Sequence, residues 1–293
     1  MSGQLKEVRT RISSVMSTQQ ITKAMKMVSA AKLKRAQDKI IQMRPYANKL
    51  NEIMENIVAG NEENLSLALA EERPLKKALA IVVSSDRGLC GGFNSNVIKR
   101  VNALLKGRFS DLEKTDLLFV GKKAYDYFKS RHEHNITDYV NLFAELSFEK
   151  TAGIADYAIS AFLKKDYDRV VIVYAQFKNA ATQDFVAERL LPLVDNDNKK
   201  TEDTISKDFI FEPSKEEILN ELIPKIVKTK VYKAVLESNA SEHGARMTAM
   251  EQATENANDL LRELRLSYNR ARQAAITTEL TEIVSGAAAL EEG

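Results

Sequence analysis

The chain has 293 residues, 44% of them hydrophobic and 29% charged, and its formal net charge is +2. This composition is typical of a folded protein with a sizeable core and excludes an overall strongly acidic or basic chain. The charge is nevertheless uneven, because residues 1–50 contain eleven Lys and Arg but only two acids, Glu7 and Asp38. Such asymmetry indicates a basic arm with an anionic partner.

Cellular location is constrained by three features. The single cysteine, Cys90, excludes an intrachain disulfide and fits a reducing compartment. No uninterrupted apolar stretch approaches the ~20 residues of a membrane span, and the N-terminal residues lack the apolar core of a secretion signal. We therefore expect a soluble, cytoplasmic chain that can still sit peripherally against a membrane complex.

Residues 1–60 are expected to form one long amphipathic helix. Apolar residues recur there at steps of three and four, as a helix with one buried stripe requires. Pro45 lies inside this pattern and should kink the helix, since proline removes a backbone hydrogen bond. The stripe comprises Leu5, Val8, Ile12, Val15, Ile40, Met43, Ala47, Leu50, Met54 and Ile57.

Residues 74–211 have a different pattern, in which short β-rich runs alternate with helical stretches. This alternation predicts parallel βαβ units and a Rossmann-like α/β domain whose sheet is covered by helices. The expected strands are "ALAIVVS", "DLLFVG", "RVVIVYAQF" and "QDFVAERLLPL".

Residues 212–293 are expected to form a second long helix. Ser214 and Glu217 have the spacing of a capping box, and Pro224 should break or kink the helix soon after its start. An unsupported helix of this length cannot bury its apolar stripe, so the two terminal helices should pair as an antiparallel coiled coil. The stripe comprises Met250, Ala253, Ala257, Leu260, Leu264, Tyr268, Ala271 and Ala275.

The glycine-rich stretch "SSDRGLCGGFNSN", residues 84–96, follows an expected strand and precedes an expected helix. Two interpretations are open: a phosphate cradle at a helix N-terminus, or a sharp turn that only serves the fold. The stretch matches neither the dinucleotide fingerprint nor the P-loop, which favours the turn and argues against direct nucleotide binding. Asp86 and Arg87 would then face a partner protein, and Cys90 would be a small buried residue.

No catalytic residue, metal site or cofactor is expected. The three histidines, His132, His134 and His243, do not form a set of converging zinc ligands, and no nucleophile has a base beside it. The basic first helix could face nucleic acid or acidic protein loops. Nucleic acid is the weaker alternative, because this helix lacks stacking aromatics. After Arg272 many side chains of the last helix are small, so the helix is slim there. This favours insertion of the helix into an enclosing partner.

Three stretches together resemble the γ subunit of F-type ATP synthases: "RISSVMSTQQITKAMKMVSAAKLKRAQ", "SSDRGLCGGFNSN" and "SYNRARQAAITTELTEIVSGAAAL". The resemblance covers essentially the whole chain, from Leu5 to Leu290. It implies a non-catalytic rotor shaft inside a ring of α and β subunits, with a base that binds the ε subunit and the membrane c ring. Ion flow would turn this base on the cytoplasmic face of the inner membrane, and the shaft would drive ATP synthesis.

The resemblance also implies which residues make contact. Contact with β subunits is carried over onto Met25, Arg246, Arg272, Gln273, Thr277 and Glu279. Phe211 and Glu212 fall where the base approaches the c ring or ε. Two other classes explain only parts of the chain: a nicotinamide oxidoreductase accounts for the central segment, and a basic nucleic-acid binder accounts for the first helix.

Overall fold

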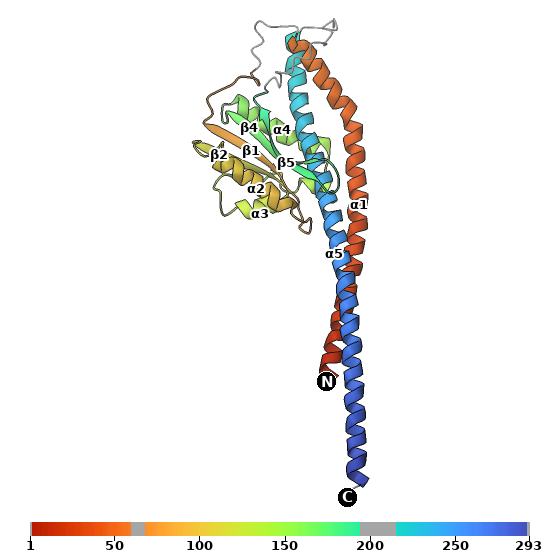
Figure 1. Ribbon diagram of the computed structural model, residues 1–293. Helices are drawn as coiled ribbons and strands as arrows, with labels where there is room; N and C mark the ends of the chain where they lie inside the picture. Colours follow the sequence, from red (N-terminus) through yellow and green to blue (C-terminus); the bar gives the residue numbers. More distant parts are fainter. Residues whose placement is uncertain (1, 60–67, 194–214, 292–293) are drawn as a thin grey trace. The chain divides into compact units, whose positions relative to one another are not determined.

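The computed structural model describes residues 2–59, 68–193 and 215–291 (Figure 1). The chain divides into two compact units, one made of Met1–Ser29 with Met247–Gly293 and the other of Ala30–Arg246. The three-segment division expected at 1–60, 74–211 and 212–293 stays a prediction, because residues 60, 211 and 212 lie outside the described residues.

The larger unit, Ala30–Arg246, is built on a five-stranded sheet in the order β3-β2-β1-β4-β5. Strands β1 and β2 are parallel and aligned from Lys77↔Lys114 to Val83↔Val120, and β3 and β4 extend the parallel arrangement on either side. The buried residues of the central strands β1 and β2 form nearly continuous apolar runs, as expected for a sheet that helices cover on both faces. The strands are β1 Lys77–Val83, β2 Lys114–Val120, β3 Asn135–Ile136, β4 Arg169–Phe177 and β5 Gln183–Leu191.

The Rossmann-like α/β fold is thus confirmed, with one correction to its strand directions. Strand β5 pairs antiparallel with β4, whereas strict βαβ alternation predicts a parallel strand. The reason is the connection: only five residues separate Phe177 from Gln183, too few for the helical crossover that a parallel pair requires. The two-residue strand β3 was not predicted either.

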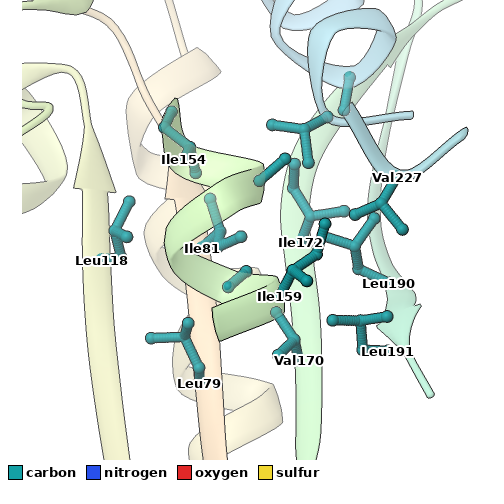
Figure 2. Packing of buried hydrophobic residues seen from close by; sticks show 14 of the residues in the cluster. Leu79, Ile81, Leu118, Ile154, Ile159, Val170, Ile172, Leu190, Leu191 and Val227 are labelled. Carbon is teal, nitrogen blue, oxygen red and sulfur yellow. The ribbon is translucent and has the colours of Figure 1, made fainter. Parts of the chain in front are cut away.

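Two hydrophobic clusters fix the helices against the sheet. Helices α2 (Phe93–Lys106) and α3 (Lys122–Phe128) cover one face, and α2 inserts Phe93, Val97, Val101 and Leu104 from a single stripe. Helix α4 (Phe148–Leu163) and the first part of α5 (Lys215–Glu291) cover the other face. Figure 2 shows Ile154 of α4 and Val227 of α5 in this second cluster, with Ile81 and Ile172 of the sheet.

The smaller unit is the antiparallel coiled coil that the sequence predicts. Within it, α1 (Ser2–Ala59) places the less exposed positions of its first part at steps of three and four, from Leu5 to Ser29. Helix α5 contributes the matching stripe from Met250 to Ala275. Within this part of α5, Met250, Ala257, Leu261 and Leu264 are buried. The polar pairs Gln19–Asn258, Thr22–Thr254 and Lys26–Glu251 fix the antiparallel register.

The two prolines do not end the helices. Helix α1 continues through Pro45, and α5 continues through Pro224, so Pro224 does not break the helix, and the expected kinks at the two prolines stay predictions. Pro224 lies ten residues into α5, where Ile223, Ile226 and Val227 are buried. Burial of this stripe compensates for the one backbone hydrogen bond that proline removes.

Gly121 holds the carboxyl ends of β1 and β2 together. Its φ is 93°, and its carbonyl accepts a hydrogen bond from the Ser84 hydroxyl, which in turn accepts the Ala124 N–H. A Cβ at Gly121 would lie 2.2 Å from the Ser84 carbonyl oxygen. Only glycine fits this position, for reasons of both backbone conformation and space.

We therefore expect Gly121→Ala to lower the free energy of unfolding by about 3 kcal/mol, since it adds backbone strain and a steric clash. Gly88→Ala is the matched control, because a Cβ there meets no atom within 4 Å and Gly88 has no positive φ. Urea unfolding of both variants measures the difference. Equal losses in the two variants would contradict this account of Gly121.

Candidate functional site

Side chains within the glycine-rich loop between β1 and α2 hydrogen-bond to one another and to its backbone. The Asn94 side-chain oxygen accepts both the Ser85 N–H, at 3.1 Å, and the Ser85 hydroxyl, at 2.9 Å. The Asn94 amide donates to the Cys90 sulfur, which is buried as predicted. Leu89 and Gly91 adopt positive φ and make the sharp turn into α2. These bonds hold the loop in its turn conformation through its own side chains, which supports the interpretation of the loop as a structural turn.

Arg246 of α5 connects this loop to the helix through hydrogen bonds to the loop backbone. Its guanidinium Nη2 donates to the carbonyl oxygens of Arg87, at 3.1 Å, and Gly88, at 3.2 Å. Its Nη1 donates to Glu242 Oε1, at 2.5 Å, and lies 3.4 Å from His243 Nδ1. The residue is only 9% exposed. The charge and the hydrogen-bond donors of Arg246 are therefore satisfied by partners within the larger unit. The predicted contact of Arg246 with a β subunit stays a prediction.

The segment of α5 that carries Arg246 packs closely against the ends of the strands. The Ser241 hydroxyl donates to the Ala175 carbonyl, at 3.0 Å, and Gly244 brings the helix against the backbone of Ala180, where a Cβ would lie 3.1 Å from the Ala180 Cα. Small residues at these positions allow helix and strand ends to touch. This close approach lets the Arg246 guanidinium reach the loop carbonyls.

Burial sets the electrostatics of this cluster. Burial raises the pKa of Glu242 despite the neighbouring Arg246 guanidinium. The pKa of His243 is lowered to about 4, first by burial and then by the positive charges of Arg246 and Lys32. His243 is therefore neutral near pH 7, and its Nδ1 lone pair faces the Arg246 guanidinium.

The two loop residues predicted to face a partner differ in exposure. Arg87 is exposed, whereas Asp86 is half-buried, and its Oδ1 has neither solvent contact nor a hydrogen-bond partner. Burial raises the pKa of Asp86, although the Lys122 N–H opposes this effect. Leu89, which the sequence analysis did not single out, is 66% exposed at the tip of the loop. Partner contact by Asp86 and Arg87 stays a prediction.

In the smaller unit, Met25 lies half-buried beside the coiled-coil seam. Its neighbours Met27 and Val28 are 60% and 57% exposed, and Ile21 is similarly exposed. Sequence reasoning missed these three apolar side chains, because periodicity identifies the stripe that pairs with α5 and not the apolar residues outside it. They form an apolar face on α1 that the described residues do not cover.

The last part of α5 carries the remaining predicted contact residues on its surface. Arg272, Gln273, Thr277 and Glu279 are all exposed, and the Thr277 hydroxyl donates to the Gln273 carbonyl at 3.0 Å. Four large apolar side chains share this exposed segment at helical spacing. They are Ile276, Leu280, Ile283 and Val284, with exposures between 49% and 68%.

The remaining predictions concern the base and the absence of chemistry. Phe211 and Glu212 lie outside the described residues. Within residues 2–59, 68–193 and 215–291, no group of three or more His, Cys, Asp or Glu side chains could hold a metal ion. No helix in the same ranges has both the length and the apolar character needed to cross a bilayer.

The fold and these surfaces define a class of protein that combines an antiparallel coiled coil with a Rossmann-like α/β domain. A family model described as ATP synthase matches residues 4–290. The ATP synthase gamma chains of Cytophaga hutchinsonii and Flavobacterium johnsoniae are 53% and 51% identical to this chain, each over 98% of both sequences. The chain belongs to the ATP synthase gamma chain family.

Solved structures agree with this assignment. A chain from the central stalk and c ring of the Tetrahymena thermophila mitochondrial ATP synthase is 27% identical, with a TM-score of 0.57 over 80% of this chain and 99% of that one. A chain of the Euglena gracilis mitochondrial ATP synthase has a TM-score of 0.67 over 100% of this chain and 96% of that one. At 23% identity, the second comparison supports the fold alone.

The Arg246 cluster gives a first prediction for this site. We expect Arg246→Met to lower the free energy of unfolding by about 3–5 kcal/mol, because it leaves the buried Glu242 carboxylate without its partner. The double variant Glu242→Gln/Arg246→Met should recover much of this loss.

Trypsin should also cleave faster after Arg87 in both variants, since the loop carbonyls lose their donor. Unchanged cleavage after Arg87, relative to exposed Arg131, would contradict the fastening role of Arg246.

The His243 titration gives a second prediction. Because the folded pKa lies below the unfolded value of 6.5, this group contributes stability above pH 6.5 that is lost as pH falls toward about 4. Between pH 7 and pH 5, we expect the parent chain to lose about 2 kcal/mol more stability than His243→Gln. Urea unfolding at several pH values measures this, with exposed His134→Gln as the control. Parallel pH profiles for all three proteins would contradict it.

Proposed function

We propose that this chain is the rotor shaft of an F-type ATP synthase, which couples rotation of a membrane c ring to conformational change at the catalytic β subunits. The carrying observation is the match to ATP synthase gamma chains at 53% identity over 98% of both chains. As a gamma chain it does no chemistry of its own, and its glycine-rich loop is a structural turn rather than a nucleotide site. Its partners are the α and β subunits, the ε subunit and the c ring.

The surface of the coiled-coil unit supports this function. Ile276, Leu280 and Ile283 leave one apolar face of α5 exposed in this chain. Fully burying each such side chain is worth about 1.5–3 kcal/mol, so a sleeve around this face would be strongly stabilising. Gly286 adds no side chain to the same segment, which keeps it thin, and a Cβ there would meet no atom within 4 Å. A ring of α and β subunits supplies a sleeve of this kind.

Torque transfer follows from the asymmetry of the shaft. A rod with different side chains on each side presents a different contact set to each β subunit, and differential contact shifts each subunit between open and closed states. Exposed ion pairs contribute only ~0–1 kcal/mol each. The shaft must therefore act mainly through packing and the stiffness of the paired helices, with charges such as Arg272 adding orientation.

The place of the chain in the cell follows from the same proposal. A gamma chain is a peripheral subunit of the synthase, and its base, including Phe211 and Glu212, lies against the c ring or ε. In a bacterial cell this is the cytoplasmic face of the inner membrane. Rotation of the base by protons or sodium ions then drives ATP synthesis, and the same shaft turns in reverse during hydrolysis.

Arg272 tests the contact with β. We expect Arg272→Ala to reduce coupled ATP synthesis by up to about fivefold, the factor that corresponds to losing one exposed pair of ~1 kcal/mol. The fold should remain intact, because the side chain is exposed. Arg270→Ala, also exposed on α5, is the matched control. The measurements are ATP synthesis by the reconstituted complex and torque in single-molecule rotation.

The outcomes separate the contact from the function. Normal torque and normal synthesis in Arg272→Ala would remove Arg272 from the contact set and leave the rotor function standing. Failure of the chain to assemble with α and β subunits into a rotating complex would overturn the proposed function itself.

A further inference from the structure

A hollow of about 290 Å³ lies at the amino end of β4 in the larger unit, between that strand, β5 and the end of α2. Its apolar lining includes Leu104, Phe109 and Val171. Three arginines, Arg108, Arg169 and Arg189, complete the lining. The glycine-rich loop follows the carboxyl end of β1, which is parallel to β4, so the hollow and the loop lie at opposite ends of the sheet.

The positive charge in this hollow is largely uncompensated. Arg189 pairs with Glu72, at 3.1 Å. In the described part of the chain, neither the Arg108 nor the Arg169 side chain makes a hydrogen bond or an ion pair. Glu72 is also the one acid that acts electrostatically on Arg169, against two guanidiniums. The one carboxylate that acts on Arg169 is therefore already paired with Arg189.

Arg169 is the unusual member of the set. Its Nε has no solvent contact and no hydrogen-bond partner, although buried donors in folded proteins are nearly always paired. Burial lowers the pKa of Arg169, and the nearby charges of Arg189 and Arg108 lower it further. A buried, unpaired donor among like charges is costly, and a bound anion would remove that cost.

We propose that this hollow is a binding site for a small phosphate-type oxyanion. The planar guanidinium fork matches the oxygens of phosphate and can form two parallel hydrogen bonds. At the end of α2, two carbonyl groups already accept hydrogen bonds, Ala103 O from Gly107 N–H and Leu104 O from Phe109 N–H, which leaves fewer free carbonyls to oppose an anion. The volume accommodates one phosphate group and lies just below the range of sites that enclose a whole cofactor.

The phosphate can come from two sources, free inorganic phosphate or the terminal phosphate of a nucleotide such as ADP. The chemistry at the arginines is the same in both cases. Two titrations of the full-length chain distinguish the sources, one with inorganic phosphate and one with ADP. Both are followed by calorimetry at constant ionic strength in a phosphate-free buffer, and phosphate-dependent thermal stabilisation is measured in parallel.

Two variants and one control test the site. Arg169→Gln and Arg108→Gln should each weaken binding at least about tenfold, because each removes a charge-assisted hydrogen bond. Arg108 is exposed, so its variant decides the matter if Arg169→Gln folds poorly. Arg100→Gln is the matched control, since Arg100 is exposed on α2 and does not line the hollow.

Saturable binding of phosphate that both variants weaken and the control retains supports the proposal with inorganic phosphate as the source. The same pattern with ADP alone supports it with the nucleotide as the source. Absence of saturable binding in both titrations overturns it. Equal weakening by Arg100→Gln, or full affinity in Arg108→Gln, overturns it as well, since binding would then reflect general positive charge.

Discussion

The structure depends on one constraint: a long helix is stable only where something covers its apolar stripe. Helix α5 has 77 residues and meets this constraint differently along its length. In the larger unit the sheet and α4 cover Val227, Val231 and Val235. In the smaller unit α1 covers the stripe that begins at Met250. From Ile276 onward the described residues of this chain provide no cover, and the proposed ring of α and β subunits would supply it.

The same helix also organises the loop that the sequence marks most clearly. Arg246 holds two loop carbonyls, Glu242 neutralises the guanidinium, and His243 stays neutral beside it. The loop is therefore tied to the helix by directional bonds and not only by packing. Any partner that pushes on exposed Leu89 or Arg87 acts on a loop whose backbone is held by α5. This arrangement suits transmission of force within a non-catalytic subunit.

Sequence patterns predicted the long helices, their antiparallel pairing and the Rossmann-like domain, because these follow from the spacing of apolar residues over many turns. They missed the direction of β5, which depends on a connection of five residues, and the short strand β3. They identified Arg246 but not its bonds, since carbonyls 158 and 159 residues away in sequence meet it only in the folded chain. The exposed face of Ile21, Met27 and Val28 carries no periodic signal.

Two arginines in the larger unit, the buried Arg246 and the half-buried Arg169, show how the surroundings of a charge distinguish a structural role from ligand binding. Arg246 has a carboxylate and two carbonyls within hydrogen-bond distance, so its charge is satisfied by the fold. Arg169 has neither, and two further guanidiniums act on it. A fold that stabilised Arg169 by itself would place acceptors around its guanidinium, as it does for Arg246. The missing acceptor is the physical reason to look for an anion from solution at one arginine and not at the other.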